Sequence, residues 1–205
     1  MSDRPTWLMF DLGGVLVDFS GPRDLPALLP PGRAAADWKL AMAGCAATDA
    51  FERGAIDLPT FAARFVRDWQ LATDADQFAQ LYVDWLRGLY AGVPALLARL
   101  RAAGYRLACL SNSNAAHWER SAPMRWLQQQ LDVAISSHQL GLRKPDPAIF
   151  AVALDRLGAP ADAVGYFDDL AANVAAATAA GLRAHHVDGI DALHARLAAL
   201  GWLDD

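Results

Sequence analysis

The fold of this chain is indicated by one stretch near its amino terminus, Trp7-Leu8-Met9-Phe10-Asp11-Leu12-Gly13-Gly14-Val15-Leu16-Val17-Asp18. The apolar run from Trp7 to Phe10 is typical of a buried strand. It ends at Asp11, and the two glycines that follow let a ligand approach the backbone closely. In open α/β sheets, ligands bind at the carboxyl ends of the strands. An acidic side chain at that edge does not help folding, so Asp11 indicates chemistry.

After Gly92 the chain alternates short apolar runs with helical stretches. Such alternation predicts a parallel sheet with helices on both faces, which places the chain in the α/β class. Asp146 and Pro147 suit the start of one helix. The expected strands are 106–110, 133–135, 164–167 and 183–187, and the expected helices are 93–103, 115–130, 147–157, 170–180 and 190–200.

The segment between Asp18 and Gly92 shows no comparable strands. Phe61, Phe65 and Trp69 recur at helical spacing, and Phe78, Tyr82 and Leu86 repeat the pattern. We therefore expect residues 19–91 to form a small helical insert that packs over the sheet edge, with few residues left for a core of its own. Residues 1–18 and 92–205 would form the α/β core.

Composition limits the classes of function. The 205 residues are 54% hydrophobic, so a sizeable core is expected. The net charge is −5, and the sequence has no stripe of basic residues that would indicate binding to nucleic acid. No apolar run approaches the ~20 residues of a membrane span, and no signal peptide is apparent. We expect a cytoplasmic protein, either a monomer or a homodimer.

Polar residues stand at four strand ends: Asp11, Ser111-Asn112, Lys144 and Asp168-Asp169. A parallel sheet brings these ends to one edge, where they offer a nucleophile, donors, a cation and a carboxylate pair. Phosphoryl transfer needs this set. Alone, Ser111-Asn112 would more often be a turn or a helix cap, and Lys144 a solvated charge. Asp168-Asp169 alone would fit a helix N-terminus and a metal site equally well. Lys144 stands between a loop and two prolines, so we do not expect it in the core.

These motifs resemble those of the haloacid dehalogenase (HAD) superfamily, in the family's order and from Phe10 to Gly181. The similarity is carried by Phe10-Asp11-Leu12-Gly13-Gly14-Val15, Leu110-Ser111-Asn112, Lys144-Pro145 and Tyr166-Phe167-Asp168-Asp169-Leu170-Ala171-Ala172-Asn173-Val174. Phe51-Glu52-Arg53-Gly54 resembles the cap segment of the branch that contains sugar-1-phosphate phosphatases and the phosphatase domain of soluble epoxide hydrolases. The resemblance implies a Rossmann-like core with a helical cap inserted after the first strand.

The resemblance also implies catalytic and substrate-binding roles. Asp11 would attack phosphorus to form an aspartyl phosphate, and Lys144 would neutralise the nucleophile and the phosphate. The substrate would be a small phosphorylated metabolite such as a sugar phosphate. The residues expected to bind it are Leu12, Gly13, Ser111 and Asn112.

A metal site is implied in the same way. Mg²⁺, a hard cation suited to a few carboxylates with phosphate and water, would be held by Asp11, Asp169 and the backbone carbonyl of Gly13. Asp168 and Asn173 would not bind the metal directly but would hold the site residues in position. The pair His185-His186 lies in a strand that we expect to be away from these motifs, so packing or exposure is favoured over metal binding.

Gly13 departs from the family pattern. Many phosphatases of the superfamily carry a second Asp there, which acts as general acid and base, a contribution of roughly 10²–10⁴-fold. Water, a good leaving group or Asp18 are the open substitutes. The alternatives to a phosphatase are a 2-haloacid dehalogenase, which needs no metal, and a non-catalytic protein that binds phosphate or a partner. A phosphomutase is disfavoured, because it needs a proton-transferring residue at Gly13.

Overall fold

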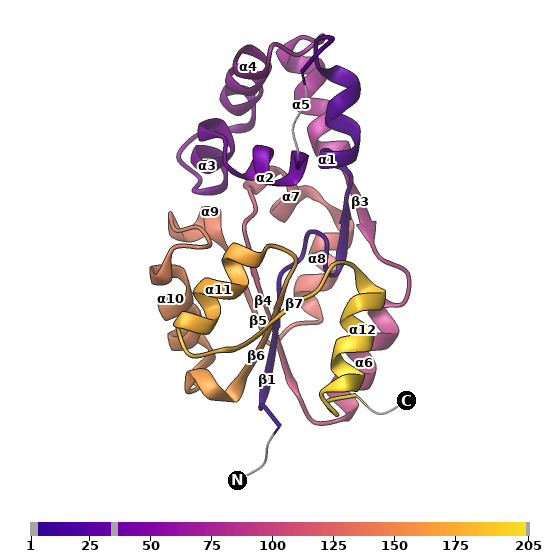
Figure 1. Ribbon diagram of the computed structural model, residues 1–205, viewed down its shortest axis with the longest axis vertical. Helices are drawn as coiled ribbons and strands as arrows, with labels where there is room; N and C mark the ends of the chain where they lie inside the picture. The colour runs from indigo at the N-terminus through magenta and orange to yellow at the C-terminus, as the bar shows by residue number, and fades with distance from the viewer. Residues whose placement is uncertain (1–3, 34–36, 204–205) are drawn as a thin grey trace.

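A sheet of five parallel strands forms the centre of the molecule (Figure 1). The computed structural model describes residues 4–33 and 37–203. The sheet order β5-β4-β1-β6-β7 places the first strand of the chain in the middle, next to β4 and β6. The strands are β1 Trp7–Phe10, β4 Arg106–Ser111, β5 Val133–Ser136, β6 Val164–Asp168 and β7 Arg183–His186.

Helices cover both faces of this sheet, as Figure 1 shows. The side chains of β1 alternate between them: Leu8 and Phe10 pack in one hydrophobic cluster, and Trp7 and Met9 pack in another. The first cluster includes α6 Val93–Ala102, α8 Ala122–Gln129 and α12 Ile190–Ala199, and the second includes α10 Pro147–Leu157 and α11 Ala171–Ala179. The predicted α/β fold is therefore confirmed.

The predicted strands and helices of the core match the observed ones to within a residue, with one exception. The expected helix 115–130 is two helices, α7 Ala115–Arg120 and α8, which meet at Ser121. The Ser121 hydroxyl accepts from the amide of Met124, and Pro123 follows in the first turn of α8. These are signals of a helix start, and they outweigh the continuous helical pattern.

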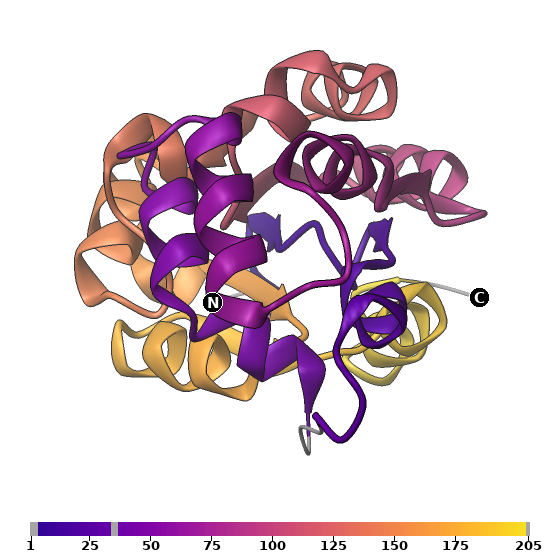
Figure 2. The same cartoon turned by 90° about the horizontal axis from the view of Figure 1, so that it is seen from above.

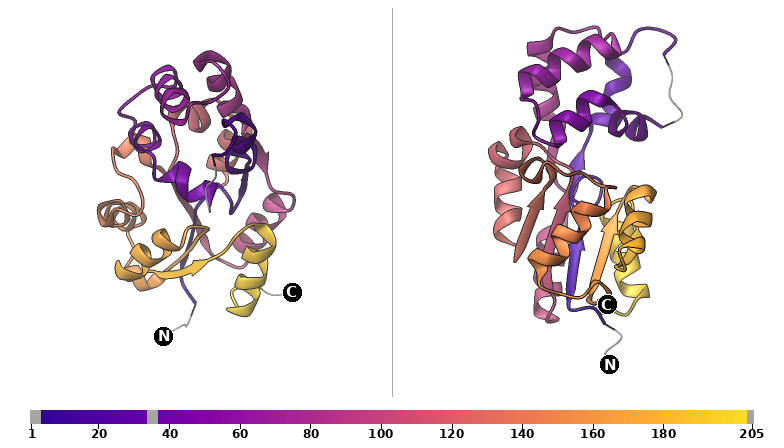
Figure 3. Two further views of the ribbon diagram at one scale, coloured as in Figure 1. Left: turned by 45° about the horizontal axis from the view of Figure 1, so that its top comes forward. Right: turned by 90° about the vertical axis from the view of Figure 1, so that its left-hand side faces the viewer.

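A second group of elements, which we call the cap, lies beyond the carboxyl end of the sheet. In Figures 2 and 3 its indigo-to-magenta helices lie over that end of the core. A hydrophobic cluster in the cap contains stacked aromatic rings, including Phe65 with Trp69 and with Phe78. The cap therefore has a hydrophobic cluster largely of its own, although few residues were expected to be left for a separate core. Its helical elements are α1 Gly21–Asp24, η1 Leu25–Leu28, α2 Trp38–Ala43, α3 Ala46–Glu52, α4 Leu58–Trp69 and α5 Ala75–Asp84.

Two strands join the cap to the core, where none was predicted. β2 Val17–Phe19 pairs antiparallel with β3 Leu86–Leu89. Leu86 therefore begins a strand and does not continue α5. These strands are only three and four residues long, so each forms because the other supplies its hydrogen bonds. The proposed boundary at residue 18 falls inside β2, and the one at residue 92 falls three residues after β3. This division of the chain stays a prediction.

The remaining short elements are α9 Ser137–Leu140 and η2 Ala161–Ala163. Within the described ranges, no helix combines the length and the apolar character needed to cross a membrane.

Candidate active site

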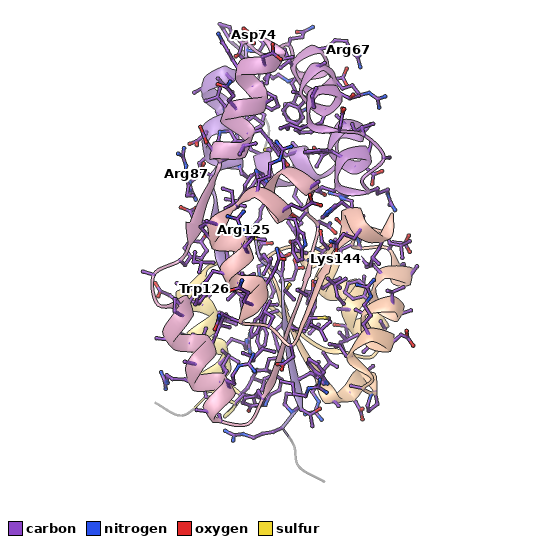
Figure 4. The ribbon with its side chains drawn as sticks, turned by 180° about the vertical axis from the view of Figure 1, so that it is seen from behind. Arg67, Asp74, Arg87, Arg125, Trp126 and Lys144 are labelled. Carbon is purple, nitrogen blue, oxygen red and sulfur yellow. The ribbon has the colours of Figure 1, made fainter. Side chains whose placement is uncertain are left out.

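The ends of the three central strands bring the predicted site residues together. Asp11 follows β1, Ser111 ends β4 and Asp168 ends β6. The amide of Asp11 donates to the carbonyl of Phe167 at 2.8 Å, which fixes the chain as it leaves the sheet. Lys144 comes from the loop after α9 and lies in Figure 4 between the sheet and the cap helices.

Lys144 is at the centre of the site and is 1% exposed, so the expectation that it lies outside the core was wrong. Its Nζ lies 2.8 Å from Asp11 Oδ1, 2.7 Å from Asp168 Oδ2, 2.7 Å from the Leu110 carbonyl and 3.0 Å from the Tyr166 hydroxyl. Burial alone would lower the pKa of this ammonium, but the carboxylates of Asp11 and Asp168 outweigh burial and raise it. Lys144 is a fixed positive charge.

Asp168 holds Lys144 in place. Its carboxylate accepts from the Tyr166 hydroxyl, from Asn173 Nδ2 at 3.0 and 3.1 Å, and from the Leu170 amide at 2.8 Å. Burial opposes its ionisation, yet Lys144 and these donors hold the pKa of Asp168 below its ordinary value. Because both of its oxygens accept hydrogen bonds, we infer a positioning role for Asp168 and Asn173.

Asp11 lies in a different environment from Asp168. Burial raises the pKa of Asp11 to about 7, with help from the charges of Asp168 and Asp169 and against the charge of Lys144. Its carboxylate lines a cavity of about 250 Å³ between the core and the cap. A buried carboxyl with a shifted pKa at a cavity wall is typical of a functional site.

Asp169 completes an acidic cluster. One carboxylate oxygen from each of Asp11, Asp168 and Asp169 lies within 4.8 Å of the others. Gly14 makes this placement possible, since a Cβ on it would lie 1.9 Å from Asp169 Oδ2 and its φ is +79°. Only glycine fits there. Hard oxygen donors at this spacing suit Mg²⁺.

Ser111 and Asn112 are brought to the same edge, but Asn112 is engaged with the neighbouring loop. Its Nδ2 donates to the Lys144 carbonyl at 3.0 Å, and its Oδ1 accepts from the Lys144 amide at 2.9 Å. This side chain therefore fixes the loop that carries Lys144. Asn112 lines the 250 Å³ cavity, and with Ser111 it lines a side cavity of about 100 Å³ next to it.

Leu12 and Gly13 form the turn after Asp11. The Leu12 side chain is buried in the core at 2% exposure, so a substrate contact would fall to its backbone. Its carbonyl accepts from the amides of Leu16 at 2.9 Å and Val17 at 2.8 Å. Gly13 lines the cavity, and the nearest atom to a Cβ built on it is 3.9 Å away. The glycine at this position therefore leaves open space where a side chain would fit.

Lys39 is a site residue that the sequence reasoning missed. It comes from α2 of the cap, and its ammonium forms an ion pair with Asp169 Oδ2. The carboxylate of Asp188 lies 3.9 Å from the same ammonium. A sequence signal was available: of the 18 basic residues only Lys39 and Lys144 are lysines, and both meet the acidic cluster.

The cap wall of the cavity contains a second ion pair. Arg143, next to Lys144 in sequence, donates to the Glu52 carboxylate and to the Ala43 carbonyl, the latter at 2.8 Å. Burial raises the pKa of Glu52 although Arg143 opposes the shift. These contacts tie the Lys144 loop to the cap helices α2 and α3.

The structure also places two further residues of the sequence analysis, Asp18 and His186. Asp18, an open candidate for proton transfer, accepts from Arg23 at 2.6 Å, and Arg23 lines the cavity. His186 was expected to lie away from the motifs, but its Nε2 is 3.0 Å from the Asp169 carbonyl. Because β7 pairs with β6 in register, it brings His186 beside Asp168.

Comparisons with known proteins identify the family of this chain. Residues 6–181 match the family model of haloacid dehalogenase-like hydrolases. Phosphatase MT3486 of Mycobacterium tuberculosis is 30% identical over 189 residues, which cover 88% of this chain and 86% of that protein. The (S)-2-haloacid dehalogenase 4A of Burkholderia cepacia is 32% identical over 105 residues, or 44% of this chain and 46% of that protein.

Solved structures support the same fold. The HAD-family enzyme BT-2542 of Bacteroides thetaiotaomicron, solved as a magnesium complex, aligns with a TM-score of 0.70 at 20% identity, over 90% of this chain and 93% of its own. A dehalogenase solved with an intermediate complex aligns with a TM-score of 0.71 at 19% identity, over 97% and 98%. The chain belongs to the haloacid dehalogenase-like hydrolase family and is an enzyme of that family.

Proposed function

We propose that this member of the haloacid dehalogenase-like hydrolase family is a Mg²⁺-dependent phosphomonoester hydrolase. It would act on a small phosphorylated metabolite, such as a sugar phosphate, through an aspartyl-phosphate intermediate. The observation that carries the proposal is the Asp11 carboxylate at the cavity wall, 2.8 Å from Lys144 Nζ and clustered with Asp169.

Asp11 is the proposed nucleophile. An oxygen of its carboxylate attacks phosphorus, the bond between phosphorus and the leaving oxygen breaks, and that oxygen departs with the electron pair. Lys144 keeps its proton throughout and offsets the negative charge of the nucleophile and the phosphoryl group. Asp168 and Asn173 keep Lys144 aimed at Asp11 during this step. Water then hydrolyses the acyl phosphate and releases inorganic phosphate.

The charge balance supports a divalent cation. The carboxylates of Asp11, Asp168 and Asp169 face the ammonium groups of Lys39 and Lys144, which leaves one negative charge in excess when all five are ionised. A phosphate dianion adds two more. Mg²⁺ held by Asp11, Asp169 and the Gly13 carbonyl would supply the missing positive charge and bind a phosphate oxygen.

The leaving group needs little protonation under this proposal, because glycine at position 13 cannot transfer a proton. An aryl phosphate or an anomeric sugar phosphate departs as a weak base and fits this site. The cavity volume of about 250 Å³ is below the usual range for drug-sized ligands. A small metabolite is therefore favoured over a nucleotide or a phosphoprotein.

The comparisons are compatible with this proposal. A phosphoglycolate phosphatase of Cupriavidus necator is 34% identical over 134 residues, which cover 61% of this chain and 58% of that protein. The substrate in the name of that enzyme, phosphoglycolate, is a small phosphorylated carboxylate. Cytoplasmic location and a monomeric or homodimeric state stay predictions.

A screen of phosphorylated metabolites and p-nitrophenyl phosphate, with Mg²⁺ and with EDTA, tests the proposed function. We expect phosphate release that EDTA abolishes and Mg²⁺ restores. Halide release from a 2-haloacid in the presence of EDTA would instead establish a dehalogenase. Tight binding of phosphate with no turnover of any ester would establish a non-catalytic protein.

A further inference from the structure

We propose that the Lys39 ammonium and a divalent cation bind Asp169 in alternation, so that metal binding releases Lys39 into the cavity. The inference rests on the proposed function, since it takes Asp169 as a metal ligand. It goes further in assigning the cap a direct part in metal binding: a cap side chain holds the metal-binding carboxylate until the metal replaces it.

The first step is the contact itself. Lys39 Nζ forms an ion pair with Asp169 Oδ2, and the Asp169 side chain is 2% exposed. The backbone of Gly14 also lies close to this oxygen. A Cβ on Gly14 would lie 1.9 Å from Asp169 Oδ2 and 3.4 Å from Lys39 Nζ. The oxygen, the glycine and the ammonium are therefore packed together, with little space for a second cation.

The second step is charge. A divalent cation at Asp169 would lie next to the Lys39 ammonium, and two like charges at such separation repel each other strongly in a buried site. Lys144 cannot give way, since its side chain is completely buried between Asp11 and Asp168. Lys39 is 33% exposed, so it is the cation that can leave.

The third step is where Lys39 goes. Asp188 Oδ1 lies 3.9 Å from its ammonium, and the Asp188 side chain is 77% exposed. Both residues line the cavity. The other end of α2 is held separately, by the hydrogen bond from Arg143 to the Ala43 carbonyl. A rotation of the Lys39 side chain toward Asp188 or a bound anion is therefore sufficient, without movement of the helix.

Titration calorimetry with Mg²⁺ alone tests the inference. We expect Lys39→Met to bind Mg²⁺ about tenfold more tightly than the wild type, because the variant lacks the competing charge. Arg23→Met is the matched control, since Arg23 lines the same cavity but pairs with Asp18. It removes one positive charge without removing a competitor for Asp169. Asp169→Asn should lose Mg²⁺ binding.

A second measurement uses the unmodified chain. It has only two lysines, so an amine-reactive reagent followed by peptide mass spectrometry reports on Lys39 separately from the buried Lys144. We expect Mg²⁺ to increase the labelling of Lys39 in the wild type. In Asp169→Asn the labelling should be high both with and without Mg²⁺.

The outcomes separate this inference from the proposed function. Equal Mg²⁺ affinity in wild type and Lys39→Met, or Lys39 labelling that Mg²⁺ does not increase, overturns the inference and leaves a Mg²⁺-dependent phosphatase intact. An equal gain in Arg23→Met also overturns it, because the effect would then be general charge and not competition. If Mg²⁺ binds to none of these proteins, both the inference and the metal dependence fail.

Discussion

The floor of the site and the cap wall above it each present one lysine to the same acidic cluster, and the two lysines differ. Lys144, in the floor, is surrounded by four oxygen atoms and its side chain is fully buried. Lys39, in the wall, meets Asp169 and lies near Asp188, and it is 33% exposed. A buried, fully bonded charge is preorganised and cannot move without large cost. A partly exposed charge such as that of Lys39 can be replaced by another cation. We therefore assign a fixed charge to the floor, in Lys144, and an exchangeable charge to the wall, in Lys39.

The largest expected effect is on the nucleophile of the floor. Asp11→Asn should reduce turnover of p-nitrophenyl phosphate by about 10⁴-fold or more, as expected when a covalent nucleophile is removed. The fold should survive, because the amide keeps the shape of the side chain and Asp168 still pairs with Lys144. Circular dichroism and steady-state rates with Mg²⁺ measure both. A variant with near-normal turnover would show that Asp11 does not attack.

Substitution of the two lysines should change the free energy of unfolding of the protein by different amounts. Lys144→Met leaves buried carboxylates without their cation, so we expect a loss of about 3–5 kcal/mol in the free energy of unfolding as well as loss of activity. Lys39→Met is the matched variant in the wall and should lose less, about 1–2 kcal/mol, because Lys39 is 33% exposed although its partner Asp169 is buried. Urea denaturation of both proteins measures the difference. Equal losses would remove the distinction between floor and wall.

Substitutions of Gly13 and Gly14 test whether the cavity between floor and wall has room for a general acid next to Asp11. Gly13→Asp should raise the turnover of a primary alkyl phosphate by up to about 10²-fold, because a general acid then protonates the leaving group. The space exists, as the nearest atom to a Cβ at position 13 is 3.9 Å away.

Gly14→Ala is the control for that variant. Its Cβ would collide with the Asp169 carboxylate, so it should lose activity with aryl and alkyl phosphates alike. Rates across a series of leaving groups compare the two variants with the wild type. If the wild type already hydrolyses alkyl and aryl phosphates equally well, another residue donates the proton. Glu52 would then be the first residue to substitute, since it lines the cavity.

The smallest effect concerns the junction between the two regions. His117 of α7 stacks on Tyr82 of α5 with ring centroids 4.8 Å apart, and its Nε2 lies 2.9 Å from the Tyr82 carbonyl. Burial lowers the pKa of His117 from 6.5 to about 4. The unfolded chain therefore binds a proton between these values while the folded chain does not. This histidine's contribution to stability is present above pH 6.5 and is lost as the pH falls toward 4.

Between pH 7 and pH 5, protonation of His117 in the unfolded chain should cost about 2 kcal/mol. His117→Gln removes this titration, so the stability difference between wild type and variant should narrow by that amount on acidification. Urea denaturation of both proteins at the two pH values measures it. Because only the difference between the proteins is used, titration of Asp11 or Glu52 cancels. Parallel pH dependence would show that His117 is not the acid-sensitive group.

The sequence by itself determined the parallel sheet, most of its helices and the residues at its edge. Apolar runs such as Trp7–Phe10 predict strands from local composition, and the direction of parallel strands then brings Asp11, Ser111 and Asp168 to one edge. Lys144 and Asp169 were placed at the same edge for the same reason. The roles of these residues stay proposals.

Only the tertiary structure decided the contacts that depend on distant partners. β2 and β3 are too short to be predicted alone and exist as a pair. The sequence around Lys144 is typical of an exposed loop, but the residue is buried because Asp11, after β1, and Asp168, at the end of β6, surround its ammonium. Lys39 meets Asp169 because the cap folds back over the sheet. Local patterns report which face of an element is apolar, whereas the meeting of two charges far apart in the chain depends on where the folded backbone places them.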